Sequence, residues 1–291
     1  MPNYYPHISC DQRYLNRQSI SIWHNKFSGW CGYLECDIEV LTPLCINTWE
    51  GGKPTFINGS TIKGMVRSAA EIVSQSCFRT DDSAPFPFES CKKGTEACTC
   101  CRLFGGSFKD DEEIMAYQSK VFFEDTKPIQ SNQINDRHLF ITHQTYNEYA
   151  DGRRVFPHSS PNFVENSSYP ASVAIEGTVF KFKVHCENLN DEELGLLLYS
   201  LELEPNMAHK LGYMKSRGLG SVRIKITKME LTNDPIKSFR QFDSQKQIIS
   251  DRCKIEEFVK KYADQYLRNN NLNDSEHLKT FRELMKYPSE I

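Results

Sequence analysis

Four segments that alternate apolar and polar residues constrain the fold of this chain more than any other feature. In residues 32–41, every second residue from Leu34 to Val40 is apolar and the residues between them are acidic. Such alternation is typical of a strand with one buried face. Strand-like patterns also occur at residues 119–124, 173–185 and 222–231, and Gly177 interrupts the second of these. The sequence therefore predicts four strands that are widely separated along the chain.

Two segments with helical periodicity lie between these strands. In residues 60–76, apolar residues recur three and four positions apart. The second helix, at residues 190–201, begins with Asn190 and Glu193, which are spaced as in a capping box. The resulting order, β-α-β-β-α-β, is that of a ferredoxin-like (RRM-like) domain. We therefore predict an α+β fold in which one antiparallel sheet has its helices on one face.

The remaining segments suggest how the chain is divided. Residues 78–118 form an insertion rich in Ser, Asp, Pro, Gly and Cys, and residues 126–172 form a long polar excursion. Excursions of this length usually carry function or are mobile. Two charged helical segments follow at residues 236–268 and 275–287. We predict one domain over residues 1–235 and a C-terminal helical extension over residues 236–291.

Composition limits the function classes. The chain has 291 residues and a formal net charge of −3, which disfavours a uniformly basic nucleic-acid binder but allows local basic patches. It lacks both a run of about 18 apolar residues and a secretory signal pattern. The eleven cysteines are an odd number. Together these features predict a protein of a reducing compartment such as the cytoplasm, with no membrane span and with cysteines that are free or bound to metal.

The segment 58–67 is a glycine-bearing turn that opens the first helix. Ser60 is the expected N-cap, and free N–H groups at a helix start attract phosphate. The basic residues of this segment lie four positions apart, on one side of the helix. An ordinary capped amphipathic helix is the alternative. The candidate nucleic-acid contacts in this segment are Asn58, Gly59, Ser60, Thr61, Lys63, Gly64 and Arg67.

A second glycine-rich basic loop, at residues 209–220, precedes the last strand. Glycines allow close approach of a phosphate chain, and the basic residues supply charge. Its candidate contacts are Lys215, Arg217, Gly218 and Gly220. A tight turn between helix and strand is the alternative. Two such loops beside the same sheet suggest a clamp on a sugar-phosphate backbone that does not select sequence.

The excursion 126–172 combines arginines with aromatic residues. Arg153 and Arg154 lie near Tyr146, Tyr149 and Phe156. Arginine next to aromatic rings suits stacking on unpaired bases. A surface hairpin with a small core of its own explains the same composition, and both interpretations stay open here.

Four cysteines lie within eleven residues of the insertion. Cys98 and Cys101 have the two-residue spacing that allows one turn to present two sulfurs to one ion, and Cys91 is the expected third ligand. The fourth is Cys100, or alternatively Cys77 or a histidine. The cluster predicts a structural Zn²⁺ site, and unmetallated surface cysteines are the alternative.

Five short motifs in this order make the chain resemble the RAMP superfamily, the repeat-associated proteins of CRISPR effector complexes. They lie at residues 41–44, 58–68, 101–105, 121–125 and 217–221. The resemblance is strongest to the backbone-type guide-RNA-binding subunits of type III complexes. It implies binding to guide RNA (crRNA) and complementary target RNA, contacts with other effector subunits and copies of itself, and a role in antiviral defence. It also implies that residues 126–172 form a thumb-like hairpin, and that the cysteines match zinc-binding insertions found in part of the family.

Catalysis is the less favoured expectation. Target-cleaving members of the family have an aspartate in the loop after the first strand, and here Glu50 is the only acid in residues 45–56. An endoribonuclease that cuts target RNA or processes precursor guide RNA would use Glu50 or His24. A zinc-stabilised protein-interaction module that binds no RNA is a third hypothesis.

Overall fold

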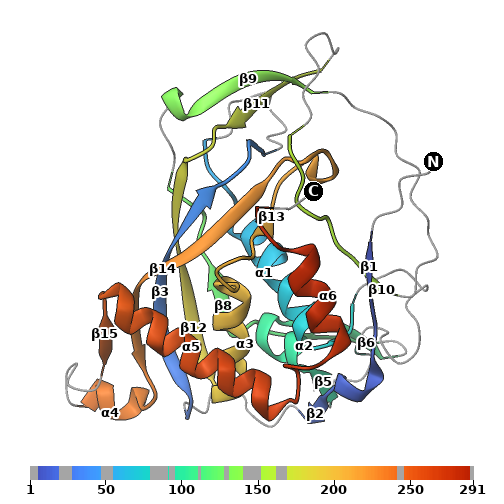
Figure 1. Cartoon of the computed structure of the whole chain (residues 1–291). Helices are drawn as coiled ribbons and strands as arrows, with labels where there is room; N and C mark the ends of the chain where they lie inside the picture. The colour runs from blue at the N-terminus through green and yellow to red at the C-terminus, as the bar shows by residue number, and fades with distance from the viewer. Residues whose placement is uncertain are drawn as a thin grey trace.

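The computed structural model describes residues 6–19, 28–46, 55–78, 91, 96–110, 113–127, 131–139, 152–161, 169–240 and 246–288. It is a mixed α+β structure built on one large antiparallel sheet, with smaller sheets around it (Figure 1). In the described part of the chain, no helix combines the length and apolar character needed to cross a membrane.

The central sheet has the strand order β13-β14-β3-β12-β8, and β15 pairs with the far end of β14. Its strands are β3 (Trp30–Val40), β8 (Val121–Phe123), β12 (Val179–Leu189), β13 (His209–Lys210), β14 (Ser221–Thr232) and β15 (Gln247–Ile249). The predicted alternation in β3 is confirmed, because its apolar residues from Leu34 to Val40 are all buried. The predicted strand at 173–185 is two strands, β11 and β12, separated by a turn at Gly177.

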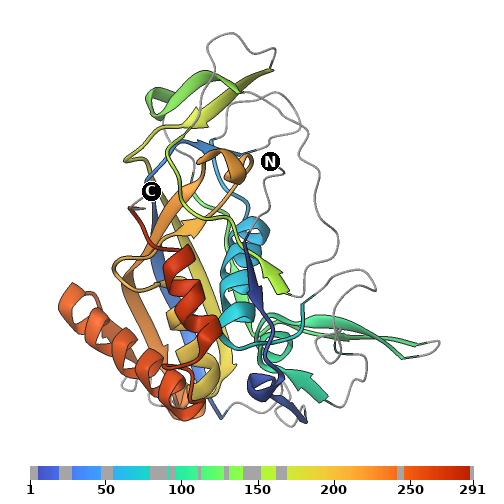
Figure 2. The same ribbon diagram turned by 45° about the vertical axis from the view of Figure 1, so that its right-hand side comes forward.

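Four helices cover the apolar face of this sheet: α1 (Gly59–Val73), α3 (Asp191–Leu201), α5 (Arg252–Asn269) and α6 (Glu276–Leu284). α1 packs against α3, α5 packs against α3, and α6 packs against α1 (Figures 1 and 2). The capping box of α3 is confirmed: the Asn190 side chain accepts the Glu193 N–H at 2.7 Å, and Glu193 accepts the Asn190 N–H at 3.1 Å. The order along the chain is β3, α1, β8, β12, α3 and β14.

The other face of the sheet carries charged residues that pair across strands. Lys183 lies 3.2 Å from Glu35, and Lys181 lies 3.2 Å from Asp37. Such exposed pairs contribute little to stability. They do neutralise much of the positive charge of these lysines.

The expected N-cap of α1 is wrong. The helix begins at Gly59, so Asn58 is the N-cap residue, and its side chain makes no capping hydrogen bond. Instead, Asp125 accepts the Gly59 N–H at 2.7 Å. Asp125 follows β8, which is close because Gly59 packs against the Phe123 carbonyl. The tertiary contact, and not Ser60, therefore supplies the acceptor.

The C-terminal segment packs on its own chain and shares the main core. It contains α4 (Pro235–Arg240) and the unpredicted strand β15 as well as α5 and α6. Arg282 of α6 forms an ion pair with Glu204 at 2.7 Å, and Arg252 of α5 pairs with Glu202. Phe281 is fully buried in the core.

The insertion and the N-terminal segment form small sheets beside α1. The elements are β1 (His7–Ser9), the 3-10 helix η1 (Gln12–Tyr14), β2 (Arg17–Ser19), β5 (Glu96–Cys98), α2 (Thr99–Phe104), β6 (Gly106–Asp110) and β7 (Glu113–Tyr117). β2 pairs with β5, and the β6–β7 hairpin projects outward (Figure 2).

The excursion 126–172 contributes the 3-10 helix η2 (Ser131–Gln133), β9 (Ile134–Leu139), β10 (Gly152–Arg154) and the start of β11 (Tyr169–Ala174). β11 pairs with β9 and with β4 (Leu44–Cys45) in a sheet beyond the end of the central one (Figure 1). β10 pairs with β1. The predicted aromatic contacts Tyr146 and Tyr149 lie outside the described residues.

Candidate functional site: a cationic cavity and a cysteine cluster

A cavity of about 470 Å³ lies between the start of α1 and the segment that joins β13 to β14. From the α1 side it is lined by Asn58, Thr61, Gly64 and Ser68. Residues three or four apart share one face of a helix. A row of small and polar residues on one side of α1 therefore forms the first wall.

The second wall is formed by residues 210–215. The Tyr213 N–H donates to the Cys45 carbonyl at 2.8 Å and ties this segment to β4. Gly212 has a φ of +81°, and a side chain there would collide with the same carbonyl oxygen. Only glycine fits this position comfortably. The tie holds Lys210, Tyr213 and Lys215 opposite α1.

The rest of the lining comes from the excursion and from the C-terminal helix. Arg154 and Phe156 follow β10, and the Lys215 ammonium lies 5.4 Å from the centre of the Phe156 ring. That distance is within the range of a cation–π contact. The deeper lining is apolar and includes Met65, Ile72, Phe281 and Met285.

The lysine and arginine side chains in the described lining of the cavity are not accompanied by acidic ones. Burial, together with the nearby charge of Lys215, lowers the pKa of Lys210 to about 8, and burial lowers the pKa of Lys215. The Lys210 ammonium donates to the Leu219 carbonyl at 3.1 Å. None of the described residues that line the cavity is an aspartate or glutamate. An anion bound there would stabilise both lysines in their charged form.

The two buried histidines nearby have structural roles. His209 bonds to the Leu201 carbonyl at 3.1 Å, and burial lowers its pKa to about 4. His158 bonds to Ser221 at 2.8 Å and to the Ala208 carbonyl at 3.0 Å, and burial also lowers its pKa to about 4. Both rings are therefore neutral at pH 7.

Five of the predicted nucleic-acid contacts line this cavity. They are Asn58, Thr61, Gly64, Arg154 and Lys215. The two glycine-bearing loops, about 150 residues apart in sequence, thus meet at one site. The first helix was expected to begin with free N–H groups, but the Asp125 carboxylate accepts the Gly59 N–H at the start of α1. The side chains around the cavity, rather than the α1 N-terminus, provide its positive charge.

Lys63 and Arg67 lie on another side of α1. The Arg67 guanidinium forms an ion pair with Glu71 at 2.7 Å, and it donates to the Gly105 carbonyl at 3.0 Å. It also lies 3.8 Å from the Cys101 sulfur. These partners engage the Arg67 guanidinium within the fold, and the expected contact of Arg67 with nucleic acid stays a prediction. Lys63 is not among the described residues that line the cavity.

Three of the glycines predicted as contacts lie close against neighbouring backbone. Gly59 lies against the Phe123 carbonyl, and Gly220 lies against the Leu211 carbonyl. Gly218, with a φ of +83°, lies against the Ser160 carbonyl. All three are buried in the fold, and their contact with a phosphate chain stays a prediction.

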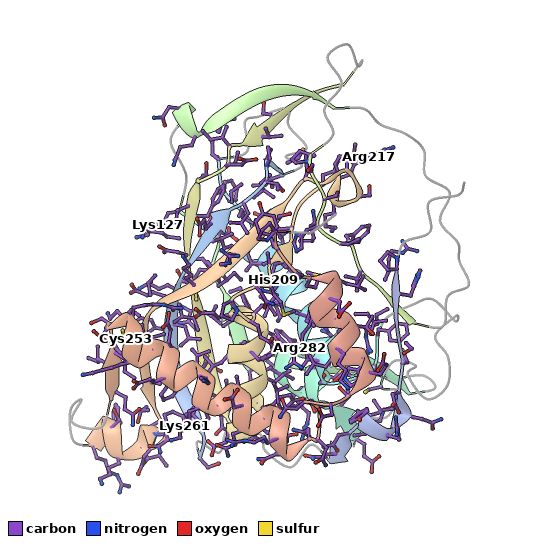
Figure 3. All side chains as sticks on the ribbon, viewed as in Figure 1. Lys127, His209, Arg217, Cys253, Lys261 and Arg282 are labelled. Atoms are coloured by element: carbon purple, nitrogen blue, oxygen red, sulfur yellow. The ribbon has the colours of Figure 1, made fainter. Side chains whose placement is uncertain are left out.

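The remaining predicted contacts lie away from the cavity. Arg153 is buried, and its guanidinium lies 4.6 Å from the centre of the Phe78 ring. Arg217 lies in the 3-10 helix η3 (Lys215–Arg217), in the loop above His209 (Figure 3). Ser60 is exposed at the start of α1. The candidate catalytic residues Glu50 and His24 lie outside the described residues.

The sulfurs of Cys77, Cys91, Cys98 and Cys101 all lie within 4.8 Å of one another and are buried. The Cys77 sulfur lies 3.5 Å from that of Cys101 and 3.5 Å from that of Cys98. A disulfide needs about 2.05 Å, so these contacts are non-bonded. Tetrahedral ligands at about 2.3 Å from a zinc ion lie about 3.8 Å apart. The four thiols therefore fit one tetrahedral metal ion.

Cys100 is not part of this group. Its sulfur lies 3.5 Å from the Ser74 hydroxyl, and its N–H donates to the Ser76 hydroxyl at 3.2 Å. Of the two cysteines considered for the fourth position, Cys77 has the right placement. Cys77 follows the end of α1, so that helix runs from the cavity at its start to the cysteine cluster at its end.

Several lining residues are absent from the sequence-based set of contacts: Met65, Ser68, Lys210, Gly212, Tyr213 and Phe156. Ser68 could have been predicted as a lining residue, because it continues the spacing of Thr61 and Gly64 on one helix face. The position of Phe156 depends on tertiary contacts that local sequence patterns do not report.

One of the comparisons with known proteins shows the family. A family model described as the RAMP superfamily matches residues 37–223, which is more than half of the chain. No curated protein matches. The crystal structure of Thermofilum pendens Csc2 is similar at 13% sequence identity and a TM-score of 0.41, over 96% of this chain and 84% of that chain. The matched span contains both loops at the cavity and all four clustered cysteines, and the chain belongs to the RAMP superfamily.

Proposed function

We propose that this chain is a guide-RNA-binding backbone subunit of a type III CRISPR ribonucleoprotein, with a ferredoxin-like core. The observation that carries the proposal is the cavity lined by Lys210, Lys215 and Arg154 without an acidic residue among its described lining. Lys210 is buried and Lys215 is half-buried, and burial lowers the pKa of both, so a bound anion would favour their charged forms. An RNA phosphate supplies that negative charge without reference to base sequence.

The proposed contacts divide by chemistry. Lys215 and Arg154 are the main phosphate contacts, and Lys210, which is buried, adds positive charge to the cavity. Asn58 and Thr61 belong to the exposed rim, where they offer hydrogen bonds to sugar or base. Guide RNA is the first partner. Complementary target RNA, other effector subunits and further copies of this chain complete the proposed assembly, which would act in the cytoplasm in antiviral defence.

We also propose that Cys77, Cys91, Cys98 and Cys101 hold one structural Zn²⁺. All four positions of a tetrahedral ion are then filled by protein thiolates, which is the arrangement of a structural site. Bound zinc would tie the insertion to the end of α1. Arg67, at 3.8 Å from the Cys101 sulfur, offsets part of the thiolate charge.

The enzymatic alternative remains a separate prediction. Cleavage of target RNA or of precursor guide RNA would depend on Glu50 or His24. Cleavage of guide-complementary RNA by the assembled complex, with Glu50→Ala and His24→Ala variants, tests it. Unchanged cutting by both variants would dismiss these two residues as catalysts.

RNA binding by the purified chain tests the main proposal. Filter binding of a single-stranded guide-like RNA at several salt concentrations should give a slope that falls by about 0.7 for each phosphate contact removed. We expect Arg154→Ala combined with Lys215→Ala to reduce both affinity and slope. Lys261→Ala, on the exposed side of α5 (Figure 3), is the matched control and should change neither. Identical slopes for the double variant and the control would contradict the proposal.

A further inference from the structure

The cavity has an apolar interior that a phosphate group alone does not explain. Met65 of α1 and Phe281 and Met285 of α6 line it, and all three are largely buried. Its volume of about 470 Å³ is within the range of sites for small organic ligands. A site for a sugar-phosphate backbone alone needs charge and polar groups at a surface. An apolar interior next to lysines suits a ligand with an apolar part and an anionic part.

The rim carries the two kinds of group that recognise a nucleobase. Tyr213 is half exposed at the mouth, and Phe156 lies beneath the Lys215 ammonium. Aromatic rings of this kind stack on unpaired bases. Among the described residues, the Asn58 amide and the Thr61 hydroxyl have no side-chain hydrogen-bond partner. An amide can both donate to and accept from a base edge.

We propose that this cavity takes one unpaired nucleotide of the RNA chain, with its base in the apolar interior and its phosphate at Lys215 and Arg154. The inference rests on the proposed RNA-binding function and adds a base-binding subsite to it. A base can enter only if it is unpaired and unstacked from its neighbours, so the site selects single-stranded over duplex RNA. The polar rim satisfies the base edge, and the apolar interior accepts either a purine or a pyrimidine.

Mononucleotides test the base-binding subsite directly. Binding of AMP, UMP, ribose 5-phosphate and inorganic phosphate to the full chain can be compared by calorimetry or by ligand-observed NMR. Stacking of one base is worth about tenfold or more in affinity. We expect AMP and UMP to bind about tenfold more tightly than ribose 5-phosphate. Equal binding of AMP, UMP and ribose 5-phosphate would overturn the inference.

Two variants separate the base subsite from the phosphate contacts. Ser68→Phe and Ser68→Trp each place a large side chain at the cavity from an exposed position on α1 and leave every basic residue and the Asn58 and Thr61 side chains in place. We expect both to remove the tenfold preference for AMP while the salt slope for single-stranded RNA stays unchanged. Thermal unfolding compares the folding of the variants with that of the wild type. An unchanged preference in both folded variants would contradict the inference.

The result also distinguishes this inference from the proposed function. If Arg154→Ala/Lys215→Ala weakens RNA binding but the base adds nothing to mononucleotide affinity, only the base subsite is wrong. If that double variant binds RNA as the wild type does, the proposed function itself is wrong.

Discussion

Two sides of α1 carry different chemistry although they belong to one helix. One side presents Thr61 and Ser68 to a cavity whose lysines come from other elements. The other side carries Arg67 and Glu71, which face the insertion and its cysteines. On the first side, positive charge gathers without a carboxylate in the described lining. On the second, the charge of Arg67 is already paired with Glu71.

The difference distinguishes a cation that is paired with an acid within the fold from cations that are not. Arg67 has an acid at 2.7 Å and a carbonyl at 3.0 Å, so its charge is used within the fold. Burial lowers the pKa of Lys210 and of Lys215, and none of the described residues that line their cavity is an aspartate or glutamate. Within the glycine-bearing segment this comparison sets Arg67 apart, whereas Lys63, whose pKa is also lowered by burial, has no ion pair in the described part of the chain.

Of the changes on the Arg67 side of α1, loss of Cys77 should have the largest effect on zinc content and on stability. Cys77→Ser removes one of four ligands, and we expect zinc content to fall well below one ion per chain. Because metal binding contributes folding free energy, the free energy of unfolding should fall by more than about 3 kcal/mol. Cys253→Ser, at an exposed site on α5 (Figure 3), is the control. Elemental analysis and denaturant unfolding measure both, and equal zinc in the two variants would refute the assigned ligand set.

Arg67→Ala should have the next largest effect on stability. The Arg67 and Glu71 side chains are 24% and 16% exposed, so removing the arginine leaves a mostly buried carboxylate without its partner. We expect a loss of about 2–3 kcal/mol in the free energy of unfolding. The salt slope for RNA should not change. A stable variant with weakened RNA binding would reverse the roles of the two sides.

The pH dependence of RNA binding probes the cavity side. Lys210 has a pKa of about 8 in the free protein, and a nearby phosphate would raise it. Binding then takes up a proton above pH 8, so affinity falls as pH rises. We expect a decrease of about tenfold between pH 7 and pH 9. The Lys210→Met variant cannot titrate there, and its profile should be flatter by that amount; parallel profiles would exclude Lys210 from the site.

The smallest expected effect on stability concerns the N-terminus of α1. Asp125→Ala removes the acceptor of the Gly59 N–H and should lower the free energy of unfolding by about 1 kcal/mol. Ser60→Ala is the matched control, and we expect no measurable change. Denaturant unfolding of both variants decides which residue caps α1.

Local patterns predicted the parts of the fold that depend on local physics. The alternation in β3 and the Asn190–Glu193 capping box follow from period and spacing within a few residues, and both are confirmed. Asp125 could not be predicted as the partner of Gly59, because the two are 66 residues apart in sequence. β15 was missed because three residues carry too short a pattern.

The candidate site was predictable only in outline. Glycines and basic residues marked the two loops that meet at the cavity. The direction of each side chain could not be read from the sequence, because it depends on which neighbour packs there. Glu71 is four residues from Arg67 on the same helix, but the Gly105 carbonyl reaches Arg67 only because α2 lies beside α1. Cys77 joins the cluster because α1 ends next to it, and spacing within the insertion could not indicate that.

The most direct test is a side-by-side measurement of the salt dependence of RNA binding for Lys215→Ala and Lys63→Ala. Both variants remove one positive charge, one from the cavity and one from the other side of α1. We predict that Lys215→Ala lowers the slope by about 0.7 and that Lys63→Ala leaves it unchanged. A lower slope for Lys63→Ala with no change for Lys215→Ala would contradict the assignment of RNA binding to the cavity.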